Sequence, residues 1–190
     1  MTQARRLQIA VGLVGGVLAG LLLVIAVAMA RGVGGPDEGR TDSNLDEAPR
    51  FIVEDFEGGT FALADHTDQP VFIYFWASWC IPCEEEAQVI ESLWPEYRER
   101  GWKFVGVNIW DAESDARHFV ERLDLTFPLV RDVERSVYVD YGVQAIPVAF
   151  FARPGLDIYA RYDGLLTEQA LRDLLDEVPI PAAGDGVTPS

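Results

Sequence analysis

The sequence predicts an α/β domain, with helices covering both faces of a central β-sheet, behind one long apolar N-terminal helix. Two observations lead to this prediction. Short apolar and β-branched runs alternate along the chain with longer segments of helical periodicity. Hydrophobic residues also make up 49% of the 190 residues, which is enough to build the core of one domain of ordinary size.

The N-terminal segment 9–30 contains no charged or strongly polar side chain. As a helix it would be about 33 Å long, which matches a bilayer core of about 30 Å. Arg5 and Arg6 precede it, so residues 1–8 are expected in the cytoplasm and the rest outside, in a single-pass protein of the cell membrane. The alternative is a cleaved signal peptide, because residues 26–30 contain A-x-A patterns. The apolar part of a signal peptide usually has about 7–15 residues, so the length favours an uncleaved anchor.

Two polar segments border the expected domain. Residues 31–47 are rich in Gly, Asp, Glu and Ser and predict a flexible linker. Residues 179–190 offer almost nothing to bury and predict a disordered tail. The folded domain is therefore expected over residues 48–178.

The charge of the exported part is strongly negative. The whole chain has a formal net charge of −16, and Arg5 and Arg6 are the only charged residues before Arg31. Without those two positive charges, the chain after residue 30 carries −18. Such a surface argues against nucleic acid and anionic lipid as partners of the domain.

The strands are predicted from apolar runs bounded by turn residues. A glycine turn at 57–60 joins the two halves of an N-terminal β-hairpin. Continuous apolar runs predict strands that are buried on both faces. In chain order the expected strands cover 51–53, 61–63, 71–76, 104–109, 148–151 and 158–162.

The helices are predicted from 3.6-residue periodicity and from capping residues. The first follows the strand at 71–76, and Pro95 lies inside it. Thr167 is expected to cap the last helix, whose inner face carries Leu and Val side chains. In chain order the expected helices cover 82–100, a segment capped by Ser114, a short piece at 133–141, and a segment from Thr167 to Val178.

The two cysteines of the chain lie where the buried strand 71–76 meets the following helix. Residues three apart in a first helical turn have Cβ atoms about 5–6 Å apart, so Cys80 and Cys83 can form a disulfide after a small adjustment. Pro82 suits that turn because its missing N–H would be unpaired anyway. The helix N-terminus favours a thiolate on the first cysteine. Cys80 is therefore the predicted nucleophile and Cys83 the resolving thiol.

Other uses of two cysteines are less consistent with the sequence. A disulfide closing so short a loop would stabilise the fold very little. A zinc site needs about four ligands, and His66 and His118 have no matching spacing, so no metal site is predicted. A Cu(I) carrier using both thiolates is the alternative from a different class. Against it, the two methionines, Met1 and Met29, lie outside the domain.

The run Phe75-Trp76-Ala77-Ser78-Trp79-Cys80-Ile81-Pro82-Cys83, with Ile146-Pro147 downstream, resembles the thioredoxin superfamily. More narrowly, it is similar to the TlpA/ResA-like branch of membrane-anchored disulfide reductases. The resemblance covers residues 50–178. It implies a thioredoxin-like fold with a mixed central sheet, the N-terminal hairpin and an inserted βα element.

The resemblance also implies site residues. In that family the proline at the position of Pro147 is cis, and its neighbour faces the cysteine pair and guides the incoming peptide. The residues expected to bind the client are Trp79, Ile81, Pro82, Ile146 and Pro147.

An acidic residue three positions after the second cysteine is typical of the family, and here it is Glu86. It is a candidate proton acceptor for the resolving thiol. The alternative, that Glu84, Glu85 and Glu86 only complement the helix N-terminus, stays open for Glu86. Tyr74 stands where thioredoxins have a buried aspartate, so that proton route is absent.

The five tryptophans are divided between two expected roles. Trp76 and Trp79 are candidates for a peptide-docking surface. Trp94, Trp102 and Trp110 are expected to be packing residues.

The implied activity is that of an extracytoplasmic protein-disulfide reductase whose redox centre is Cys80–Cys83, with no other cofactor. The implied client is apocytochrome c or another extracytoplasmic protein during its maturation. The implied electron donor is a transmembrane thiol protein of the CcdA or DsbD type. A net oxidant or isomerase is the alternative, because the direction depends on a reduction potential that the sequence does not give.

Overall fold

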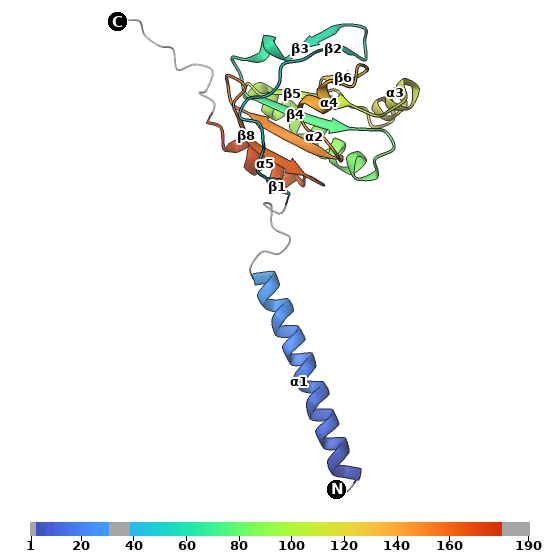
Figure 1. The fold of residues 1–190 in the computed structure, drawn as a ribbon, viewed down its shortest axis with the longest axis vertical. Coiled ribbons are helices and arrows are strands. Elements are labelled where there is room, and N and C mark those ends of the chain that lie inside the picture. The colour runs from blue at the N-terminus through green and yellow to red at the C-terminus, as the bar shows by residue number, and fades with distance from the viewer. Residues whose placement is uncertain (1–2, 31–38, 180–190) are drawn as a thin grey trace, which may run out of the picture. The chain divides into compact units, whose positions relative to one another are not determined.

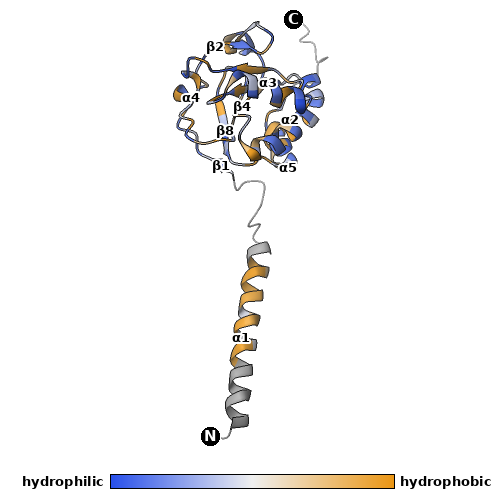
Figure 2. Cartoon of the chain, turned by 90° about the vertical axis from the view of Figure 1, so that its right-hand side faces the viewer, coloured by the Kyte–Doolittle hydropathy of each residue, from blue (hydrophilic) through white to orange (hydrophobic). Residues whose placement is uncertain are grey.

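The computed structural model describes residues 3–30 and 39–179 and divides the chain into two units, Met1–Glu38 and Gly39–Ser190. The first unit contains helix α1, Gln3–Ala30, which includes the apolar stretch 9–30 (Figure 1). Its side chains are described for residues 13–27, which are apolar or glycine and exposed (Figure 2). Among the described residues, no helix has both the length and the apolar character needed to cross a membrane.

The second unit is built on one mixed sheet, which has eight strands within residues 39–179. The strand order is β1-β8-β7-β4-β5-β6-β2-β3. β4 pairs in parallel with β5 and β5 with β6, and the other pairings are antiparallel. The strands are β1 Arg40–Thr41, β2 Ile52–Asp55, β3 Thr60–Ala62, β4 Val71–Trp76, β5 Lys103–Asn108, β6 Leu129–Arg131, β7 Val148–Ala152 and β8 Ile158–Asp163.

Strand β4 lies in the middle of the sheet, and every one of its six side chains is buried. It lies between β5 and β7, so neither of its edges reaches solvent. The continuous apolar run that predicted this strand is therefore confirmed. The hairpin is also confirmed, and its turn uses Gly58 at φ 87°, a conformation that glycine adopts without strain.

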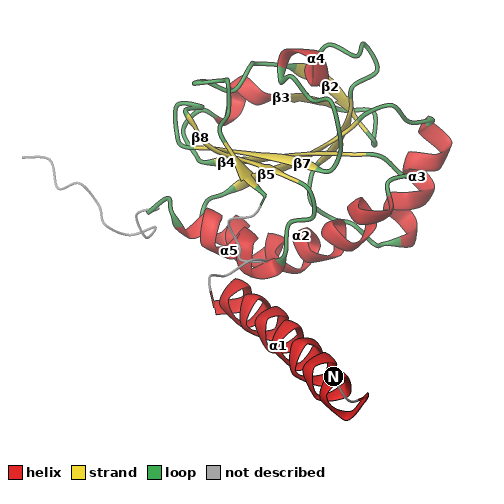
Figure 3. Cartoon of the chain, turned by 60° about the horizontal axis from the view of Figure 1, so that its bottom comes forward, coloured by secondary structure: helices red, strands yellow, loops and turns green. Residues whose placement is uncertain are grey.

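The helices lie on both faces of the sheet (Figure 3). Their bounds are α2 Ile81–Glu99, α3 Glu113–Arg122, α4 Val137–Asp140, α5 Glu168–Asp176 and a 3₁₀ helix, Leu63–His66. Side chains of α2, α3 and α5 pack with Phe72, Tyr74 and Trp76 in one core layer. Side chains of α4 and of the 3₁₀ helix pack with Val71, Ile73 and Phe75 in the other. The alternating side chains of β4 thus form part of two cores.

Helix α5 follows the sequence prediction closely. Thr167 caps it, because the Thr167 hydroxyl accepts a hydrogen bond of 3.2 Å from the Ala170 amide. Its inner face is buried, including Leu171 and Leu175. The expected cap at Ser114 is wrong, since α3 begins at Glu113 after Ala112 and the Ser114 hydroxyl instead donates to Asp115.

The expected linker 31–47 is wrong over its second half. Residues 40–41 form β1, which pairs with β8, and Glu47 bridges to Asp157. Arg40 also donates to Glu177 at 3.1 Å, beyond the end of α5. The folded unit therefore begins at Gly39 rather than at residue 48. The first half of that linker, 31–38, and the predicted tail from residue 180 lie outside the described residues.

Candidate active site

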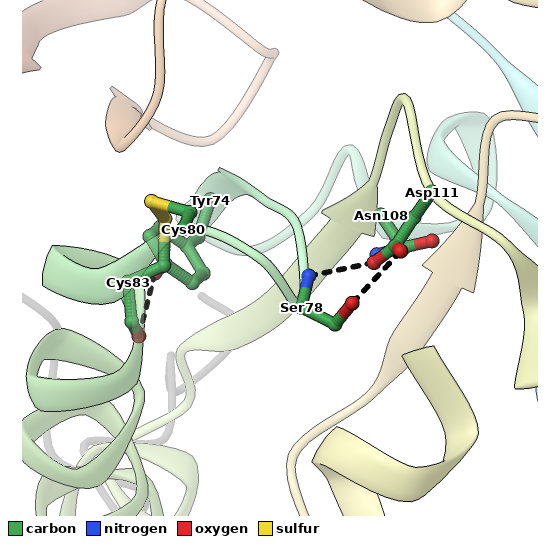
Figure 4. The surroundings of a disulfide bond; sticks show 6 residues. All are labelled: Tyr74, Ser78, Cys80, Cys83, Asn108 and Asp111. Carbon is green, nitrogen blue, oxygen red and sulfur yellow. Dashed lines mark hydrogen bonds between the residues drawn. A yellow bond between two sulfur atoms is a disulfide. The ribbon is translucent and has the colours of Figure 1, made fainter. Parts of the chain in front are cut away.

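Cys80 and Cys83 form a disulfide at the N-terminus of α2 (Figure 4). Their Cα atoms are 5.2 Å apart. β4 ends at Trp76, a three-residue loop follows, and Cys80 is the N-cap of the helix that begins at Ile81. The amide of Cys83 donates to the carbonyl of Cys80 at 3.1 Å, so the pair lies within the first turn of α2. The geometry expected from the spacing is present.

The two sulfur residues differ in exposure. Cys83 is 0% exposed, whereas Cys80 retains 5%. Cys80 is therefore more enclosed than its place at a helix N-terminus suggests, but it is the member of the pair that reaches the surface. Its apolar neighbours lie open to solvent, Trp79 at 57% and Ile81 at 80%. Pro82 is also exposed. The cysteine pair thus lies under an exposed apolar rim.

Tyr74 lies behind the disulfide in the core. Its hydroxyl donates to the carbonyl of Cys83 at 3.2 Å, which ties the resolving cysteine to β4. Burial raises the pKa of Tyr74 well above its ordinary value, and the nearby charge of Glu86 raises it further. Tyr74 is therefore a neutral hydrogen-bond donor in the range of physiological pH.

Glu86 is buried one turn beyond Cys83 in α2. Burial raises the pKa of its carboxyl group well above the ordinary value, and the backbone amide of Leu166 opposes this shift. Among the described residues, neither carboxyl oxygen has a hydrogen-bond partner of normal geometry. Glu84, in contrast, is fixed at the surface by Arg122, which lowers its pKa by donating to both of its oxygens, at 2.6 and 3.0 Å. The three consecutive glutamates therefore do not share one environment.

The Ile146–Pro147 peptide bond is cis. Ile146 is half-buried and packs against both core layers, one of which contains the two cysteines. The carbonyl of Pro147 accepts a hydrogen bond of 3.0 Å from the amide of Gly164, which joins this turn to the end of β8. The cis proline expected from the resemblance is thus present.

A carboxylate that the sequence analysis did not single out, Asp111, holds the loop between β4 and α2. It accepts hydrogen bonds from the backbone amide and the hydroxyl of Ser78, at 2.6 and 2.8 Å (Figure 4). It also accepts from the side-chain amide of Asn108 at 2.9 Å. A signal was present in the sequence, because Ser78 and Asp111 each follow a strand that was predicted to be buried. The carboxyl ends of parallel strands meet at one edge of a sheet.

One tryptophan expectation is wrong, and a second holds only in part. Trp76 is buried, and its ring stacks on Phe119 with centroids 4.9 Å apart, so it belongs to the core and not to a docking surface. Trp110 packs on one side only, because its ring meets Tyr138 edge-on with centroids 5.2 Å apart while 37% of the residue stays exposed. Its carbonyl accepts a hydrogen bond of 3.0 Å from the indole N–H of Trp79. The exposed aromatic pair at the site is therefore Trp79 and Trp110, while Trp94 and Trp102 are buried as expected.

A cleft of about 460 Å³ opens beside this loop. It is formed by the turn after β5 and the segment after β6, and its lining residues are Asn108, Trp110, Asp111, Arg131, Asp132, Val133 and Arg135. Trp110 and Asp111 belong both to this cleft and to the contacts of the Cys80 loop. Over residues 3–30 and 39–179, no group of three or more His, Cys, Asp and Glu side chains is placed to hold a metal ion.

Comparison with known proteins agrees with this geometry. The AhpC/TSA family matches residues 45–160. The thiol–disulfide oxidoreductase ResA of Geobacillus thermodenitrificans is 32% identical over 131 residues, which cover 69% of this chain and 75% of the relative.

Among solved structures, a putative thiol:disulfide interchange protein DsbE from Chlorobium tepidum aligns with a TM-score of 0.63 at 26% identity. The alignment covers 70% of this chain and 98% of that one. StoA from Bacillus subtilis aligns with a TM-score of 0.60 at 24% identity, over 68% of this chain and 98% of its own, which supports the fold. With a CxxC disulfide at the N-terminus of α2, the chain belongs to the thioredoxin-like AhpC/TSA family and is a ResA-like thiol–disulfide oxidoreductase.

Proposed function

We propose that this oxidoreductase is held at the cell membrane by residues 9–30 and reduces disulfides of client proteins outside the cytoplasm, such as apocytochrome c. One observation carries the exchange role of the two cysteines. Cys80 presents a small exposed surface under an apolar rim, and Cys83 lies directly behind it, fully buried and within bonding distance. A client disulfide can therefore reach one sulfur, while the other is reserved for the internal step.

The proposed reaction has two exchanges. The Cys80 thiolate attacks a client disulfide, so that a Cys80–client bond forms and the first client sulfur leaves as a thiolate. Cys83, as a thiolate, then attacks Cys80 Sγ, the Cys80–Cys83 bond forms, and the second client sulfur leaves. Two electrons pass to the client, and the protons of the two enzyme thiols end on the two client sulfurs. The cysteine pair is itself the redox centre, so these steps require no further cofactor.

Glu86 supplies the proton acceptor for the second exchange in this proposal. Burial raises its pKa, which makes the ionised carboxylate a stronger base, and its place one turn from Cys83 in α2 suits transfer from the buried thiol. Tyr74 fixes the backbone of Cys83 by donating its hydroxyl hydrogen to the Cys83 carbonyl. The client occupies the surface around Trp79, Ile81 and the cis Ile146–Pro147 bond, with the neighbouring cleft of about 460 Å³ open to one of its side chains.

The membrane tether is supported by the composition of α1. Residues 9–30 carry no charge, and Arg5 and Arg6 precede them. The large apolar side chains of residues 13–27 are exposed, which favours an apolar surrounding medium. A transmembrane thiol protein of the CcdA or DsbD type would then supply electrons on the same side of the membrane as the domain.

The direction of electron flow is tested with a peptide that carries an oxidised Cys-x-x-Cys-His haem-attachment motif. We expect the reduced full-length protein, in detergent, to reduce one peptide disulfide per molecule, while Cys80→Ser has no activity. Preferential oxidation of the reduced peptide by the oxidised protein would favour the oxidant alternative. Stoichiometric Cu(I) binding without peptide reduction would favour a copper carrier.

The tether is tested by fractionating cells that produce the full chain or a form lacking residues 1–30. We expect the full chain to stay in membranes after alkaline carbonate extraction, because about 20 apolar residues span a bilayer. Protease added outside spheroplasts should digest the domain. Release of a soluble form cut near residue 30 would show instead that the segment is a cleaved signal peptide.

A further inference from the structure

We propose that Asp111 is a positioning residue, which fixes the loop before Cys80 and thereby sets where a client disulfide meets the attacking sulfur. The proposal rests on the role of Cys80 proposed above. Asp111 does not contact the cysteines in any hydrogen bond of the described residues. Its effect is transmitted through Ser78 and Trp79, which belong to the three-residue loop between β4 and Cys80.

The carboxylate of Asp111 accepts hydrogen bonds from three donors. One oxygen accepts from the backbone N–H of Ser78 at 2.6 Å and from Asn108 Nδ2 at 2.9 Å. The other oxygen accepts from the Ser78 hydroxyl at 2.8 Å. Hydrogen bonds to an ionised acceptor are shorter and stronger than neutral ones. A single side chain therefore ties the active-site loop to the end of β5 (Figure 4).

The turn that carries Asp111 is itself held in place. Asn108 is the last residue of β5 and is buried, and the amide of Ile109 donates to the carbonyl of Trp76 at 3.0 Å. Trp110 adopts φ 55°, a left-handed conformation that is rare for an aromatic residue. Such backbone strain persists where the surroundings enforce it, and it is concentrated at functional sites.

The same turn holds the loop at a second point. The carbonyl of Trp110 accepts from the indole N–H of Trp79 at 3.0 Å. The loop is thus fixed at Ser78 by a side chain and at Trp79 by a backbone carbonyl, and the next residue is Cys80. Because Trp79 is the more exposed of the two aromatic rings, its orientation determines the surface on which a client lies beside the disulfide.

Two substitutions separate positioning from a charge effect. Asp111→Ala removes all three acceptor contacts. Asp111→Asn removes the charge but keeps an oxygen that can accept from the Ser78 and Asn108 N–H groups, while the Ser78 hydroxyl can turn to accept from the new amide. If Asp111 acts by position, Asp111→Asn should keep the behaviour of the wild-type protein that Asp111→Ala loses. If it acts by charge on the thiolate, the two variants behave alike.

The experiment uses the full-length protein and the oxidised Cys-x-x-Cys-His peptide. For Asp111→Ala we expect KM to rise about tenfold with kcat nearly unchanged, as when binding geometry is lost. We expect hydrogen exchange at the Ser78 amide to accelerate by about 10–100-fold, because this amide loses its hydrogen-bond acceptor. The pH dependence of Cys80 alkylation should not move, and Asp111→Asn should be close to wild type in every measurement.

Asp115→Ala is the matched control, since it removes a carboxylate from the exposed start of α3 that, within the described residues, forms no side-chain hydrogen bond or ion pair with the loop. Ser78→Ala keeps one of the two Ser78 bonds, so it should raise KM less and be non-additive with Asp111→Ala. If Asp111→Ala does not fold, Ser78→Ala replaces it as the test variant. Equal shifts of the alkylation profile in both Asp111 variants, or unchanged KM and exchange, would overturn the proposal. A wild-type protein that fails to reduce the peptide contradicts the proposed function instead. Hydrogen exchange at the Ser78 amide still tests whether Asp111 holds the loop.

Discussion

Cys83→Ser is expected to turn the enzyme into a trap in which client proteins accumulate as mixed disulfides on Cys80. The resolving thiol of Cys83 normally attacks from within the same helical turn, where an intramolecular nucleophile acts at an effective concentration far above that of any external thiol. Without it, release of the client should slow by at least about 10³-fold. The adducts are detected by their mass on non-reducing gels, and peptide mapping identifies the residue that carries the client.

The matched variant is Cys80→Ser, which should trap nothing. It leaves only Cys83, whose side chain is completely buried and cannot be reached by a protein disulfide. The double variant should also trap nothing. If adducts formed on Cys83 in Cys80→Ser and none formed in Cys83→Ser, the roles assigned to the two cysteines would have to be exchanged.

Glu86→Gln is expected to stabilise the folded protein at neutral and higher pH. The folded-state pKa of Glu86 lies well above 4.5, so the folded state binds this proton more tightly than the unfolded state. Its contribution to stability is therefore present below about pH 4.5 and is lost as pH rises toward the folded-state pKa. The slope is at most about 1.4 kcal/mol per pH unit. A neutral amide of the same shape removes this loss.

Urea unfolding of the two proteins from pH 4 to pH 8 measures the effect. The gain from Glu86→Gln should be near zero at pH 4 and grow with pH, whereas Glu85→Gln, on the exposed side of the same helix, should show no such growth. The same variant should slow resolution of the mixed disulfide about 10²-fold, because a general base is lost. A gain that does not depend on pH would contradict the titration of Glu86 in this range.

The sequence predicted those parts of the fold that depend on periodicity. The run 71–76 became the central strand because six consecutive apolar side chains can be satisfied only between two packed layers. Thr167 became a cap because its hydroxyl needs only a neighbour three residues away. β1 escaped prediction because its two residues are exposed and owe their conformation to pairing with β8, more than 100 residues further on.

In the active site, too, the local features were predictable from the sequence and the long-range contacts were not. The cysteine pair was predictable from a spacing of three residues and the start of a helix. The contacts of Asp111 with Ser78 join residues 33 apart in sequence, and only the parallel pairing of β4 and β5 places them at one sheet edge. The packing of Trp76 was missed because its alternation in β4 turns it inward against Phe119, whereas its place in the active-site motif suggested an outward role.

The complete burial of Cys83 has a consequence for damage by peroxide. Of the two sulfurs, only Cys80 is open to an oxidant, and a sulfenic acid formed there has a thiol within bonding distance. Condensation to the disulfide with loss of water then competes with further oxidation to the irreversible sulfinic acid. A single oxidation at Cys80 thus yields the ordinary disulfide form of the protein, which thiol–disulfide exchange can reduce again.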